Sequence, residues 1–150
     1  MQIDVRQIGN QIYELVFDET TIAISISDME RLHHQLSDIL RPEMSQEKRS
    51  RHQAFLTKLK TAEDNGIQAL LRAAAHDDIL ILLHSSEQDD DLKKKLYRNL
   101  SENSIKIYME DLVFQFRDGV PDYRFDEAMA RLLQTAETLS KDGALNFKIF

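Results

Sequence analysis

The sequence predicts an α+β protein that is mainly α, with a three-stranded antiparallel β meander at the N-terminus and a multi-helix array after it. Over the first 27 residues, apolar and polar side chains alternate with the two-residue period of half-buried strands. From Ser45 onward, apolar side chains recur instead at the three- and four-residue spacing of amphipathic helices. Hydrophobic residues make up 42% of the 150 residues, and glycine and proline number only four and two, so the chain has enough apolar side chains to build a core.

The meander is indicated by three apolar runs that two polar turns separate. Glycine and asparagine accept the positive φ of tight hairpin turns, and alternating isoleucines are typical of a strand with one buried face. In chain order the predicted parts are a first strand with Ile3 and Val5, a turn at Gly9-Asn10, a second strand from Ile12 to Phe17, a turn at Asp18-Glu19-Thr20 and a third strand with Ile22, Ile24 and Ile26.

A helix is predicted directly after the meander. Ser27 followed by Glu30 matches a capping box, in which the two side chains accept hydrogen bonds from free backbone N–H groups at a helix start. Apolar residues at helical spacing follow, and Pro42 ends the run because proline cannot continue the hydrogen-bond ladder. We expect this helix to cover the apolar face of the sheet.

The remainder of the chain is expected to form successive helices between short polar breaks. The apolar stretch Ile79 to Leu83 predicts a short helix that is buried on every side. The other signals are a break at Asp64-Asn65-Gly66, a helix opening at Asp89 to Asp91, a cap at Ser101, a left-handed C-cap at Gly143 and a terminal strand through Leu145, Phe147 and Ile149. The expected organisation is a β meander with a capping helix over residues 1–43 and a helical domain over residues 45–150, packed as one compact unit.

Charge and composition exclude several classes of function. The net charge of −7 argues against nucleic acid as a partner, because that binding requires a basic surface. The longest apolar run is far shorter than the roughly 20 residues of a membrane-spanning helix, so no membrane insertion is expected. The N-terminus lacks the features of a secretory signal and cysteine is absent, which together favour a cytoplasmic location.

Five short strings, in order along the chain, are similar to strings in the C-terminal domain of the bacterial flagellar motor switch protein FliG. They are "DNGIQALLR" (Asp64 to Arg72), "LKKKLYRNLSENS" (Leu92 to Ser104), "YMEDL" (Tyr108 to Leu112), "DEAMARLL" (Asp126 to Leu133) and "KDGAL" (Lys141 to Leu145). Their order and spacing over more than half of the chain make the resemblance moderately specific. It implies an armadillo-like helical domain that works by contact with another protein and without catalysis. The N-terminal meander has no counterpart in that domain.

The resemblance also implies a protein-binding surface. Glu110 and Asp111 occupy the place of an acidic pair on the ridge that faces the stator, beside Tyr108. Two positions depart from the family pattern, since His84 stands where a lysine is expected and Asn103 replaces an arginine. The expected partner is therefore a stator-like, rotor-like or regulatory protein, and the chain is expected to be an adaptor of a motility or membrane complex.

Other classes of function receive less support from the residues. No nucleophile, base and orienting group are recognisable, and the sequence lacks phosphate-binding glycine loops, so neither an enzyme nor a cofactor is expected. Adjacent histidines at His33-His34 diverge by about 100° on a helix, and His76-Asp77-Asp78 is typical of a polar helix start, so no metal is expected. The alternative is a structural protein that forms a homo-oligomer through its β meander.

Overall fold

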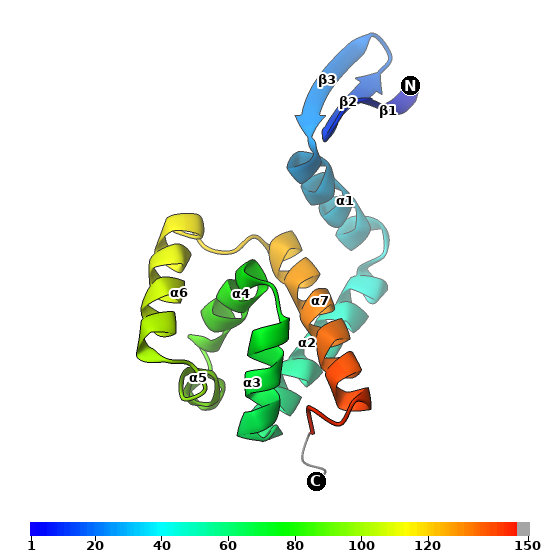
Figure 1. The fold of residues 1–150 in the computed structure, drawn as a ribbon. Coiled ribbons are helices and arrows are strands. Elements are labelled where there is room, and N and C mark those ends of the chain that lie inside the picture. The colour runs from blue at the N-terminus through cyan, green and yellow to red at the C-terminus, as the bar shows by residue number, and fades with distance from the viewer. Residues whose placement is uncertain (147–150) are drawn as a thin grey trace. The chain divides into compact units, whose positions relative to one another are not determined.

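A computed structural model describes residues 1–146 of the chain (Figure 1). It confirms the predicted fold class, because within these residues an antiparallel sheet is followed by helices alone. The elements are β1 (Ile3–Gly9), β2 (Ile12–Phe17), β3 (Thr20–Ser25), α1 (Ile26–Leu40), α2 (Pro42–Thr61), α3 (Asp64–Ala73), α4 (His76–Ser86), α5 (Asp90–Tyr97), α6 (Glu102–Gln115) and α7 (Asp122–Lys141). The chain divides into two compact units, Met1–Gln46 and Glu47–Phe150.

The N-terminal sheet is a meander with the strand order β1-β2-β3, and both pairs of neighbouring strands are antiparallel. The second predicted turn is found where expected, and Asp18 adopts a positive φ of 52°. The prediction for the first turn was wrong in detail. Gly9 still pairs with Ile12 in the ladder, and the positive φ of 62° belongs to Gln11.

The start of α1 differs from the predicted capping box. Ser25 is the N-cap, and its hydroxyl oxygen accepts a hydrogen bond from the backbone N–H of Asp28 at 3.2 Å. The helix therefore begins before Ser27, directly at the end of β3. Pro42 ends the α1 run as predicted and is itself the first residue of α2, where its missing N–H has no intrahelical acceptor to lose.

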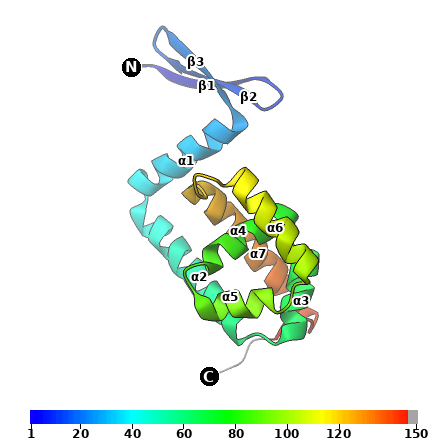
Figure 2. The ribbon, with the colours of Figure 1, turned by 90° about the vertical axis from the view of Figure 1, so that its left-hand side faces the viewer.

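The prediction that α1 covers the apolar face of the sheet was wrong. No residue of α1 is buried. On the sheet, Ile3 and Val5 remain 60% and 59% exposed. Figures 1 and 2 show α1 leaving the sheet at the end of β3, and its contacts with the sheet are mainly with β2 and β3.

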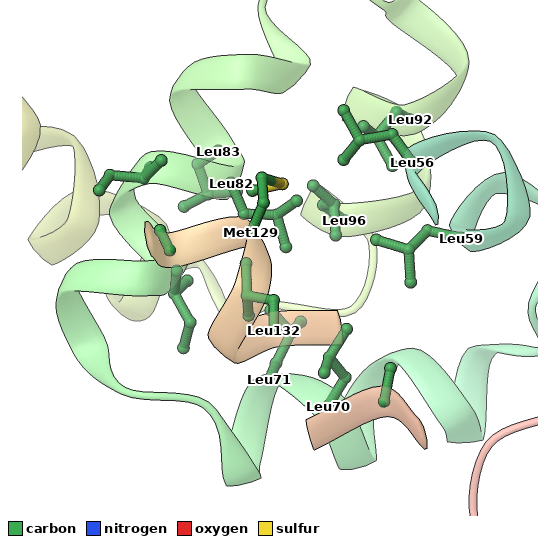
Figure 3. Close-up of a cluster of buried hydrophobic side chains, with 14 of the residues drawn as sticks. Leu56, Leu59, Leu70, Leu71, Leu82, Leu83, Leu92, Leu96, Met129 and Leu132 are labelled. Carbon is green, nitrogen blue, oxygen red and sulfur yellow. The ribbon is translucent and has the colours of Figure 1, made fainter. Parts of the chain in front are cut away.

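The core of the helical unit is built around α4. All five side chains from Ile79 to Leu83 are at most 2% exposed, which confirms the prediction of a helix buried on every side. The neighbours of α4 are α5, α6 and α7, and α3 packs against α7 and α5. Figure 3 shows the contributing leucines and one methionine converging: Leu56 and Leu59 from α2, Leu70 and Leu71 from α3, Leu82 and Leu83 from α4, Leu92 and Leu96 from α5, and Met129 and Leu132 from α7.

Several helix ends in this unit lie where the sequence signals predicted them. The predicted break at Asp64-Asn65-Gly66 was wrong, because these residues form the first turn of α3 and α2 already ends at Thr61. Asp89 caps α5, and Ser101 caps α6 by accepting a hydrogen bond from the Ser104 N–H at 3.0 Å. Gly143 adopts a φ of 76° just after α7, as predicted for a left-handed C-cap. The chain then returns to α3, where Leu145 lies buried against Gly66. The predicted terminal strand extends through residues 147 and 149, which lie outside the described part of the chain.

Candidate protein-interaction surface

Helix α6 has two unlike faces. Tyr108, Met109 and Leu112 are half-buried and pack against the core, Ile105 is also half-buried, and no residue of the helix is fully buried. The opposite side exposes apolar side chains in an unusual number. Ile107 is 47% exposed, Val113 64% and Phe114 85%, and the exposed carboxylate of Glu110 lies between them along the helix. We call Ile107, Glu110, Val113 and Phe114 the α6 surface.

The predicted acidic pair is divided between these two sides. Oδ2 of Asp111 lies 2.7 Å from Nε2 of His76, at the start of α4. Because an ionised carboxylate only accepts hydrogen bonds, Nε2 of His76 carries the donated proton. Glu110 is one residue earlier and so points about 100° away, into solvent. Asp111 therefore helps to hold α6 in place, whereas Glu110 is available to a partner.

Tyr108 belongs to the same anchoring contact. Its ring stacks on the imidazole of His76, with the ring centroids 5.0 Å apart and the planes inclined by 29°. Partial burial raises the pKa of the Tyr108 hydroxyl above its usual value. One turn further along α6, the side-chain amide of Gln115 donates to Oδ1 of Asp77 at 3.4 Å. Two polar contacts thus join α6 to the first turn of α4.

The two remaining predicted residues lie elsewhere. His84 is exposed in the last turn of α4, and Asn103 is exposed in the first turn of α6. Within residues 1–146, neither forms a hydrogen bond or an ion pair with the cluster of His76, Tyr108 and Asp111. The structure therefore brings Tyr108 and Asp111 together but leaves His84 and Asn103 apart from them.

The turn after α6 and the first turn of α7 place charged groups next to the α6 surface. Arg117 and Arg124 line a shallow depression of about 480 Å³ together with Phe114 and Phe116. The guanidinium of Arg124 lies 5.1 Å from the centroid of the Phe116 ring, a cation–π contact that holds this arginine over the turn. Asp118 also lines the depression, so beyond Phe114 two arginines and one aspartate follow the single carboxylate of Glu110.

Sequence reasoning missed His76 and the three apolar members of the α6 surface. His76 was interpreted only as part of a helix start, which it also is, since α4 begins there. Its contact with Asp111 spans 35 positions, and no local pattern reveals such a contact. Phe114 did carry a signal, because it is out of phase with the inward stripe of Tyr108 and Leu112.

The described residues contain neither a metal cluster nor a membrane-spanning helix. Nowhere in residues 1–146 do three or more His, Cys, Asp or Glu side chains gather in a way that could hold a metal ion. Over the same residues, no helix combines the length and apolar composition that crossing a bilayer requires.

A helical array with a half-buried peripheral helix, which presents apolar and charged groups outward, is the architecture of an interaction domain. The family model described as the FliG C-terminal domain matches residues 38–147. Since this range covers more than two thirds of the chain, the protein belongs to the FliG C-terminal domain family, and the resemblance drawn from short strings is confirmed. The match begins before residue 64 and so also takes in α2. A comparison with curated proteins finds no match.

Proposed function

We propose that the chain is a non-catalytic protein-interaction module, related to the flagellar rotor protein FliG, that binds a protein partner through the α6 surface. In this role it acts as an adaptor of a motility or membrane complex. The exposure of Phe114, at 85%, together with that of Val113 and Ile107 on one helix of the family domain, carries the proposal. Buried aromatic side chains dominate the binding energy of protein interfaces. An exposed aromatic side chain contributes hydrophobic free energy only when a partner removes it from water.

The charges around Phe114 favour a partner of a particular chemistry. Glu110 precedes Phe114 by one helical turn. Arg117, Asp118 and Arg124 line the depression beyond Phe114, where two positive charges outweigh one negative charge. An amphipathic partner helix would place a basic residue opposite Glu110, an apolar residue against Phe114 and an acidic residue near the two arginines. Complementary charge of this kind sets the orientation and the rate of association more than the affinity itself.

The proposal is tested by comparing variants as bait in affinity capture from native cell extract, with quantitative identification of the retained proteins. The variants are Phe114→Ser and Glu110→Lys, and the control is Glu137→Lys, an exposed position on α7. We expect one protein to be retained by the wild type and the control but lost by both α6 variants. Its dissociation constant, measured with purified components, should rise by roughly 10- to 100-fold for Phe114→Ser.

The salt dependence of partner binding distinguishes the contact made by Glu110 from the contact made by Phe114. Binding of the wild type should weaken as salt screens the contact of Glu110, and Glu110→Lys should reduce that dependence. If every protein that the wild type captures is retained equally by Phe114→Ser and Glu110→Lys, the α6 surface is not the binding site and the proposal fails.

A further inference from the structure

One face of the β meander is apolar and carries no charge. Strand pairing aligns its side chains in three rows across β1, β2 and β3, because directly paired residues lie on the same side of a sheet. The rows are Ile3, Phe17 and Thr20; Val5, Leu15 and Ile22; and Gln7, Tyr13 and Ile24. The opposite face holds Asp4, Arg6 and Glu14. We call the uncharged side the meander face.

The meander face lies open within its own unit. Ile3, Val5 and Ile22 are 60%, 59% and 48% exposed, although they share the face with the half-buried Leu15 and Phe17. Of residues 1–44, all of which the structure describes, none is buried. A three-stranded sheet in water depends on covering its hydrophobic face, so this unit lacks a core that would stabilise it alone.

Helix α1 adds a second uncovered apolar stripe to the same unit. Met29, Leu32, Leu36 and Ile39 follow one another at intervals of three, four and three residues. This is the spacing with which helices pair with a copy of themselves in coiled coils. Leu36 and Ile39 are 46% and 76% exposed, and the neighbouring Leu40 is 73% exposed. Met29 and Leu32, nearer the sheet, are half-buried, so the open part of the stripe is its second half at Leu36 and Ile39.

We infer that a second copy of this chain covers the meander face and the α1 stripe, forming a symmetric dimer through residues 1–40. This inference uses a surface separate from α6 and does not rest on the proposed function. Each chain carries a net charge of −7, so two copies repel each other most weakly where they meet through an uncharged face. Two-fold symmetry brings the meander face of one chain against the meander face of the other, and the α1 stripe against its own copy. Apolar faces of sheets stack in this way at a separation of about 10 Å.

The available area is sufficient when the two surfaces act together. Three strands of about six residues cover roughly 14 by 20 Å, or roughly 300 Å². The 15 residues of α1 add a stripe of roughly 200 Å². Two copies then bury roughly 1,000 Å² in total, which is the lower limit for a specific interface, whereas the sheet face alone falls short of it.

The first experiment measures the mass of the full chain in solution by analytical ultracentrifugation over a range of concentrations. We expect twice the 17.5 kDa of one chain at micromolar concentration. Ile22→Asp places a charge on the meander face and should raise the dimer dissociation constant at least tenfold, because the charge would be buried without a partner. Thr21→Asp, the matched control on the opposite face, should leave the dimer intact.

A second experiment does not depend on a disruptive substitution. Because the chain contains no cysteine, Leu15→Cys introduces a single thiol at the centre of the meander face. A bis-maleimide with a reach of about 10 Å should link two Leu15→Cys chains, because that reach matches the spacing of stacked sheets. Glu14→Cys, on the other face of the same strand, should not be linked.

The outcomes separate the possible occupants of the face. A wild-type chain that stays monomeric up to about 100 µM would overturn the inference, because weak dimers are detected at roughly that protein concentration. The meander face would then be covered by another protein or by the rest of the same chain. A dimer that Ile22→Asp and Thr21→Asp weaken equally would also overturn it. So would equal cross-linking of Leu15→Cys and Glu14→Cys.

Discussion

Arg131 on α7 and Asp78 on α4 form a two-point ion pair, with Nε 2.9 Å from Oδ2 and Nη2 2.8 Å from Oδ1. The carboxylate is the buried partner, since the side chain of Asp78 is 4% exposed and that of Arg131 is 55% exposed. A fork of this geometry binds a carboxylate more strongly than a single contact does. The pair therefore fixes α7 against the first turn of the central helix α4.

Replacing Arg131 should destabilise the helical unit. Arg131→Met keeps much of the aliphatic stem but leaves the carboxylate of Asp78 buried without its main partner, so we expect a loss of about 1–3 kcal/mol. Urea unfolding followed by circular dichroism measures this change. Lys93→Met is the control, because Lys93 pairs with Glu87 in solvent, where an ion pair contributes little to stability. Equal shifts in the two variants would contradict the special role of the buried pair.

Gly66→Ala should destabilise the same unit through a steric contact. A Cβ at this position would lie 2.6 Å from Cδ1 and 3.2 Å from Cα of Leu145, which is fully buried. Alanine favours helices over glycine by about 1 kcal/mol, and the cost of overpacking, about 1–3 kcal/mol, should exceed that gain.

The control for this substitution is Asn65→Ala, an exposed residue in the same turn of α3. It gains helix propensity without a clash and should leave the unfolding midpoint equal or slightly higher. The double variant Gly66→Ala, Leu145→Ala should show positive coupling, because shortening Leu145 removes the nearest atom. Stability equal to wild type in Gly66→Ala would mean that the segment after α7 moves aside freely.

His52 should make stability depend on pH. Its side chain is only 5% exposed, and Nδ1 lies 3.3 Å from Oδ1 of Asp126. Burial lowers the pKa of His52 below 6.5, and Lys48 adds to this lowering, while Asp126 opposes it. Below pH 6.5 the unfolded chain therefore takes up a proton that the folded chain accepts only at lower pH, and the free energy of unfolding falls as the pH drops through this window.

His52→Leu should remove this pH dependence. The measurement is the urea midpoint at pH 7.5 and pH 5.5 for wild type and variant, and the difference between the two pH values should shrink in the variant. The carboxylates of Asp64 and Asp89 have pKa values lowered from 3.8, by hydrogen bonds chiefly from Asn99 and Lys60 respectively, so their contribution is lost only in more acidic solution. An unchanged pH dependence in His52→Leu would assign the effect to another group.

The two neighbouring carboxylates of α6 should differ in their effect on stability. Asp111→Lys removes the contact with His76 and places like charges side by side when that histidine is protonated, so we expect a loss of about 0.5–1 kcal/mol. Glu110→Lys should leave the thermal midpoint nearly unchanged. Thermal unfolding of the two single variants tests this. If Glu110→Lys is the more destabilising of the two, the division of roles between the two carboxylates is wrong.

Local signals in the sequence predicted most of the helical unit. The apolar run from Ile79 to Leu83 has no polar side to expose, so its burial follows from composition alone. Ser101 and Gly143 mark helix ends because capping depends on backbone groups within one turn. Ser25 and Ser27 are both suitable N-cap residues. The cap is Ser25 because α1 begins directly where β3 ends.

The arrangement of the candidate site was beyond local signals. The contact between His76 and Asp111 depends on how α4 and α6 pack, which no spacing rule supplies. Exposure of Phe114 likewise depends on which side of α6 meets the core. The uncovered meander face was mispredicted because the alternation of isoleucines indicates only that one side of a sheet is apolar, not which element covers it.

Helix α6 packs on the rest of its unit through a half-buried apolar stripe and through polar contacts with α4. None of its side chains is fully buried. Detaching it would expose far less hydrocarbon to water than detaching α4, whose apolar centre is wholly enclosed. Of these two helices, α6 is therefore the one that can separate from the helical unit at the lower cost in free energy, while α4 stays enclosed.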